Sequence, residues 1–75
     1  MKQLDEAVRD FDRAISLNPD YAFAYFNRAV ARFHLKEYEG ALEDVRMCEK
    51  LGVRPPPDFL KVLAAAAPRP NPAIK

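Results

Sequence analysis

The sequence predicts an all-α fold in which antiparallel helices form three core elements and a short helix follows at the C-terminal end. Two segments carry apolar residues three and four positions apart, which is the spacing of an amphipathic helix. The two segments repeat each other at a constant offset of 34 residues, a period typical of repeat architectures. The residues that correspond at this offset are Leu4, Ala7, Val8, Phe11, Ala14 and Leu17 in the first segment and Tyr38, Ala41, Leu42, Val45, Cys48 and Leu51 in the second.

The first helix is expected within residues 3–19. Asn18 and Pro19 end it, because proline lacks a backbone N–H group and biases the preceding residue away from helical geometry. Asp20 follows as a residue that can cap the next helix through its carboxylate. The sequence therefore predicts a turn between the first two helices.

The middle helix is expected from Asp20 to Leu35, a stretch without glycine or proline. Apolar side chains lie on most sides of it, which predicts a helix packed between neighbours. The third helix begins where the apolar stripe restarts at Tyr38. It ends at Leu51, because Gly52 supplies the left-handed residue that follows many helices.

Residues 58–67 are expected to form the fourth helix. Asp58 is a capping residue, Phe59 begins an apolar side, and four alanines favour helical structure. Residues 1–67 are thus expected to form one helical domain. The prolines within residues 68–75 break the helix, and this segment is expected to be a flexible tail.

The 34-residue helix-turn-helix period resembles the tetratricopeptide repeat (TPR). Counted from Ala22, the residues at the family's packing positions are Tyr25, Ala29, Ala41, Val45 and Cys48. The resemblance implies a half repeat at residues 3–19, a full repeat at residues 20–53 and a capping helix at residues 58–67.

Three residues depart from the family pattern. Lys36 stands where the family favours a turn glycine, Arg32 replaces the usual aromatic residue, and Val53 stands where the repeat-ending proline is expected. None of these changes removes a packing position, so the fold prediction stands.

Composition restricts the function. The chain is 49% hydrophobic and 31% charged, and its net charge of +1 gives no overall attraction to nucleic acid or to an anionic membrane. No stretch approaches the roughly 18 consecutive apolar residues of a membrane span. Cys48 is the single cysteine, which fits a reducing, cytoplasmic setting. We therefore expect neither nucleic-acid nor membrane partners.

No catalytic, metal-binding or cofactor-binding set of residues is expected. The chain has one histidine and one cysteine, His34 and Cys48, which is too few for a zinc site. In antiparallel helices these two residues would lie on the order of 15 Å apart, so they cannot form a nucleophilic pair. The sequence indicates that the protein is not an enzyme.

The resemblance to TPR proteins implies a protein-interaction module, because the first helices of successive repeats line a groove for peptides in that family. The matching residues here are Phe23, Phe26, Asn27, Val30, Phe33 and His34. Asn27 resembles the asparagine that helps to bind a peptide's terminal carboxylate in chaperone adaptors. The alternative is that the aromatic residues are core. Arg28, Arg32 and Lys36 also form a basic stripe that either attracts an acidic peptide or is paired with carboxylates.

A second hypothesis is self-assembly. The residues Leu4, Val8, Phe11 and Ile15 form an apolar stripe that one neighbouring helix covers only in part, and exposed apolar area favours association. A homodimer would bury it. The chain could equally be a piece of a longer repeat array, since about three repeats are usually needed for stability.

Overall fold

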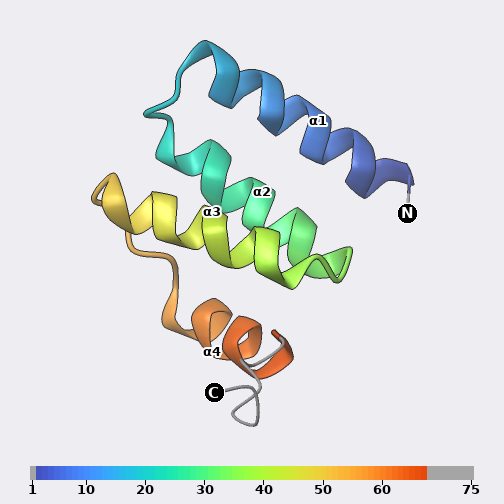
Figure 1. Cartoon of the computed structure of the whole chain (residues 1–75), viewed down its shortest axis with the longest axis vertical. Helices are drawn as coiled ribbons and strands as arrows, with labels where there is room; N and C mark the ends of the chain where they lie inside the picture. Colours follow the sequence, from blue (N-terminus) through green and yellow to red (C-terminus); the bar gives the residue numbers. More distant parts are fainter. Residues whose placement is uncertain (1, 68–75) are drawn as a thin grey trace, which may run out of the picture.

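The structure is a computed structural model that describes residues 2–67, and it contains four α-helices in that range (Figure 1). They are α1 (Lys2–Leu17), α2 (Ala22–His34), α3 (Tyr38–Lys50) and α4 (Pro57–Ala66). Consecutive helices run in opposite directions, and α1 and α4 lie at the two ends of the stack (Figure 1). The predicted all-α, TPR-like fold is confirmed. The expected flexible tail, residues 68–75, lies outside the described residues.

The turn between α1 and α2 differs from the expected one. The side-chain Oδ1 of Asn18 accepts a hydrogen bond from the backbone N–H of Asp20 at 3.2 Å, and the carbonyl of Asn18 accepts one from Tyr21 at 3.0 Å. Asp20 is therefore part of the turn, and the N-cap of α2 is Tyr21, which makes no side-chain capping bond. The prediction that Asp20 caps this helix is wrong, because the turn uses one residue more than expected.

The helix ends of α2 and α3 share one hydrogen-bonding pattern. After α2, the N–H groups of Lys36 and Glu37 donate to the carbonyls of Phe33 and Arg32 at 3.0 and 2.8 Å. This arrangement requires a left-handed residue after the helix, and Lys36 has φ 64° there. Gly52 has the same role after α3 with φ 90°. A lysine with this backbone conformation is strained, and glycine, which the TPR resemblance implies at this position, would not be.

The core lies between α2, α3 and α4. Its buried residues are Ala29, Ala41, Val45 and Leu63, with the exposed fraction at most 6%. Alanine on both α2 and α3 lets the two helices approach closely, and Leu63 of α4 fills the remaining space. Cys48 is also fully buried, as expected of a packing residue.

Helix α4 begins one residue earlier than expected. It starts at Pro57, directly after Pro56. Neither proline has a backbone N–H group, and nothing is lost by this because the first N–H groups of a helix have no acceptor within the helix. Asp58 lies inside the first turn, and the N-cap Pro56 makes no side-chain capping bond. The prediction that Asp58 caps α4 is therefore wrong, since the proline pair starts the helix by fixing its backbone angles.

Candidate interaction surface

A buried carboxylate organises the first three helices. Only 2% of the Asp44 side chain is exposed. The Arg28 guanidinium binds it in a bidentate manner, with Nε 3.0 Å from Oδ2 and Nη2 2.6 Å from Oδ1. Arg32 adds a longer contact of 3.3 Å from Nη1 to Oδ2. These charge-assisted bonds offset the loss of hydration that burial of Asp44 entails.

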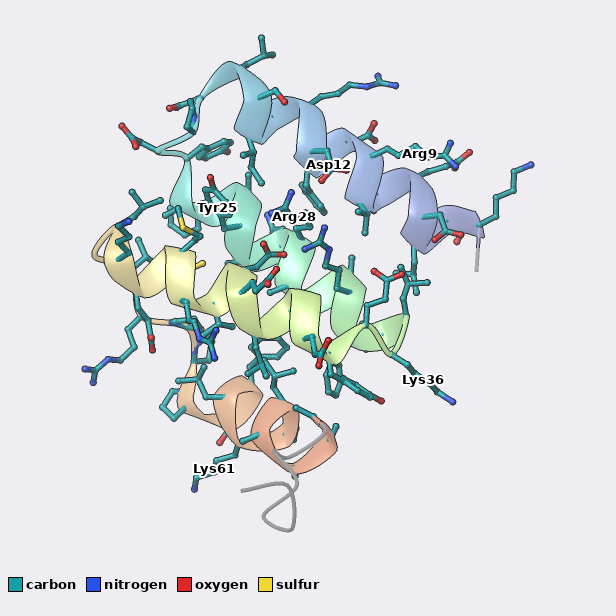
Figure 2. The ribbon with its side chains drawn as sticks, viewed as in Figure 1. Arg9, Asp12, Tyr25, Arg28, Lys36 and Lys61 are labelled. Atoms are coloured by element: carbon teal, nitrogen blue, oxygen red, sulfur yellow. The ribbon has the colours of Figure 1, made fainter. Side chains whose placement is uncertain are left out.

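Arg28 also connects these helices to α1. Its Nη1 lies 2.7 Å from Oδ1 of Asp12, and its guanidinium lies 5.5 Å from the centre of the Tyr25 ring. Figure 2 shows Arg28 between α1 and α3 with Asp12 beside it. Hydrogen bonding to Asp44, and then to Asp12, raises the pKa of Arg28, so this side chain stays charged at every accessible pH. One arginine thus joins three helices.

The basic stripe on α2 is consequently not free to attract an acidic peptide. Arg28 and Arg32 both turn toward Asp44 and are only 16% and 22% exposed. Lys36 is exposed and points away from the helices in Figure 2. Arg28 and Arg32 are therefore paired with a carboxylate, as in the alternative interpretation, whereas Lys36 is exposed after the end of α2.

The six predicted partner-binding residues of α2 divide into two groups. Phe26 and Phe33 face α4, because their rings lie 5.7 and 5.8 Å from the ring of Phe59 in edge-to-face arrangements. Phe33 also lies 5.8 Å from the Tyr38 ring. Both phenylalanines are half-buried. Helix α4 of the same chain therefore covers them.

The other four residues form an exposed strip, which we call the α2 strip: Phe23, Asn27, Val30 and His34. They follow one another at spacings of four, three and four residues, so they lie on one side of the helix. Phe23 is 60% exposed, Asn27 and His34 are exposed, and Val30 is half-buried. The remaining sides of α2 contact α1, α3 and α4, so the strip is its uncovered side.

The apolar stripe of α1 is only partly covered. Leu4, Val8, Phe11 and Ile15 are all half-buried, and no residue of α1 is fully buried. Leu17, at the end of this helix, is 87% exposed. The sequence analysis made no prediction for the exposure of Leu17, which it only matched with Leu51 at the 34-residue offset.

Two findings concern the chemistry of the described residues. No group of three or more histidine, cysteine, aspartate or glutamate side chains among residues 2–67 could hold a metal ion. Burial raises the pKa of the Cys48 thiol, and the nearby carboxylates of Asp44 and Glu49 raise it further. The thiol is therefore protonated at neutral pH and is a poor nucleophile. Over the same range, none of the helices has the length and apolar character needed to cross a membrane.

Comparisons with known proteins agree with this architecture. Residues 1–36, which span α1, α2 and the start of the following turn, match the family model described as "TPR repeat". The match confirms the resemblance inferred from the sequence. No solved structure gave a significant match to the chain.

Two curated proteins show similarity to part of the chain. The "Hsp70-Hsp90 organising protein" of Plasmodium falciparum is 33% identical over 42 residues, 56% of this chain. The "RNA polymerase II-associated protein 3" of Xenopus laevis is 48% identical over 44 residues, 59% of this chain. In both cases the match covers 7% of the relative's length. The chain therefore corresponds to a small part of each relative.

Proposed function

Taking the TPR-like helical repeat as the premise, we propose that this chain is a protein-interaction module that presents the α2 strip to a peptide or protein partner. The observation that carries the proposal is the division of α2. Three of its sides are occupied by the chain's own helices, whereas the fourth exposes 60% of Phe23 beside Asn27 and His34. Aromatic side chains are enriched at protein–protein interfaces relative to the rest of the surface.

The chemistry of the α2 strip suggests the kind of ligand. Phe23 and Val30 offer apolar contacts, whereas the Asn27 amide and the His34 imidazole can hydrogen-bond to a peptide backbone or carboxylate. The names of the two relatives refer to Hsp70, Hsp90 and RNA polymerase II. Hsp70 and Hsp90 are the first partners to test, because Asn27 also resembles the carboxylate-binding asparagine of chaperone adaptors.

The test is a binding titration of the whole chain against purified Hsp70 and Hsp90, compared with the variant Phe23→Ser. We expect this substitution to weaken binding about tenfold, because it removes the most exposed apolar contact of the strip. Val62→Ser on α4 is the matched control, since Val62 is also apolar and 49% exposed but lies on another helix. Equal binding by all three proteins would contradict the proposed site.

The same proposal places the module in the cytoplasm and gives it no enzymatic activity, cofactor, nucleic-acid partner or membrane partner. The protonated, buried thiol of Cys48 and the pairing of Arg28 and Arg32 with Asp44 support it. A retarded band on RNA or DNA that disappears with added salt would contradict it.

Self-association through α1 is the second candidate. Its support is that the stripe of Leu4, Val8, Phe11 and Ile15 remains half-exposed although α1 packs on α2. A homodimer, or neighbouring repeats in a longer array, would bury this surface. The test is the solution mass over a hundredfold range of concentration, where a dimer abolished by Phe11→Ser would support this candidate and a constant monomer mass would contradict it.

A further inference from the structure

The surface beneath α4 has the character of a binding site that the chain's own helix occupies. We call it the α4 cradle and define it by Phe26, Phe33, Ala29, Ala41 and Val45. Phe59 and Leu63 of α4 pack on it, and Leu60 is also packed against the core cluster. Phe59 meets both phenylalanine rings at 5.7 and 5.8 Å, and Leu63 is 99% buried against the alanines and Val45.

The attachment of α4 differs from that of the other helices. Charged hydrogen bonds join α1, α2 and α3 through Asp12, Arg28 and Asp44. Within residues 2–67, no side chain of α4 makes a hydrogen bond or ion pair with another helix. Apolar contacts alone therefore hold α4 in place.

The local structure of α4 also favours release. It has 10 residues, a length at which an isolated helix is only marginally stable, and no side chain caps its start. Pro55 is fully buried, whereas Pro56 and Pro57 after it are exposed. The outer side of α4 exposes Val62 and Lys61, and Figure 2 shows Lys61 pointing away from the other helices. We expect α4 to have the lowest local stability among the helices that build the core.

From these contacts we infer that α4 is a detachable cover and that the α4 cradle binds an amphipathic helix of a partner protein in its place. The matching helix carries an aromatic residue followed four positions later by a branched aliphatic residue, because Phe59 and Leu63 have this spacing and fill the cradle. This surface is separate from the α2 strip, so either proposal can fail without the other.

Because α4 is attached to the same chain as the α4 cradle, it competes with any free helix for that surface. A segment attached to its own site acts at an effective concentration in the millimolar range, so a free helix competes poorly with an intact α4. Weakening the attached α4 must therefore strengthen binding of the free helix.

The probe is a fluorescent synthetic peptide with the sequence of residues 57–67, titrated by anisotropy into the full chain. We expect Phe59→Ala in the full chain to bind the peptide at least about tenfold more tightly than the unsubstituted chain does. Val62→Ala is the matched control, because Val62 lies on the exposed side of α4, and it should bind as the unsubstituted chain does. A control peptide with alanine in place of the residues that correspond to Phe59 and Leu63 should not bind.

No gain with Phe59→Ala, or equal binding of the control peptide, would overturn the inference. So would an unsubstituted chain that is a dimer and that Phe59→Ala converts to a monomer, because the cradle would then belong to α4 of a second copy. Hydrogen exchange of the unsubstituted chain tests release without any substitution. We expect amides of α4 to exchange at least about tenfold faster than core amides of α2 and α3, and equal protection would overturn the inference.

Discussion

Replacement of Asp44 by asparagine tests the charged network at its centre. The substitution keeps the shape of the side chain, removes its charge and leaves one acceptor oxygen for two arginines. Arg28 then keeps its bond to Asp12, and Arg32 keeps its 3.4 Å contact with the carbonyl of Gly40. Both guanidinium groups lose a charged partner while remaining about four-fifths buried.

The expected loss is about 2–3 kcal/mol in the free energy of unfolding. Removing one partner of a buried pair costs about 3–5 kcal/mol, and the retained oxygen and residual exposure of the arginines place this case below that range. For a domain of this size, about 1 kcal/mol shifts the Tm by about 4–8 °C. Thermal and urea unfolding followed by circular dichroism would therefore show a Tm lower by about 10–20 °C.

Asp12→Asn is the matched control for this measurement. The Asp12 side chain is 48% exposed and makes one contact with Arg28, so its loss should cost less than about 1 kcal/mol. Equal destabilisation by the two asparagine variants would refute the reasoning, because burial of Asp44 would then have no energetic consequence.

Three further predictions concern stability. Lys36→Gly should stabilise the fold by about 0.5–1 kcal/mol in urea unfolding, since φ at this residue is 64°, whereas Lys36→Ala should give no gain. Leu63→Ala should lower the free energy of unfolding by about 2–3 kcal/mol, because Leu63 is only 1% exposed. Val62→Ala, on the exposed side of α4, should lower it by less than about 1 kcal/mol. Because the pKa of the Cys48 thiol is raised in the folded chain, the unfolded chain loses the thiol proton at a lower pH. The free energy of unfolding should therefore fall as pH rises above about 9, and the Cys48→Ala variant should not show this fall. A thiol reagent should also label the folded chain slowly.

The helices could be predicted because their signals are local. The 34-residue period and the Gly52 stop depend on spacing and backbone preference alone, and both agree with the structure. The helix starts were predicted less well. Asp20 and Asp58 are good capping residues in general, but the Asn18 side chain and the proline pair before Asp58 decided the actual starts.

The candidate site could be predicted only in part, because it depends on contacts between distant segments. Spacing placed Phe26 on the same helix as Asn27, but only the packing of Phe59 turns Phe26 toward α4. The charged network of Asp12, Arg28 and Asp44 likewise depends on contacts between residues that are far apart in the sequence. Arg28 lies 16 residues from each of its partners, Asp12 and Asp44, and no local pattern marks those pairs.

The proposed role of the α2 strip is tested most directly by chemical-shift mapping of the isotopically labelled chain during titration with Hsp70 and with Hsp90. We expect the largest shifts at the amides of Phe23, Asn27, Val30 and His34, with those around Asp44 unchanged. Shifts confined to α1, or the absence of any shift at saturating concentrations of both chaperones, would contradict the proposal.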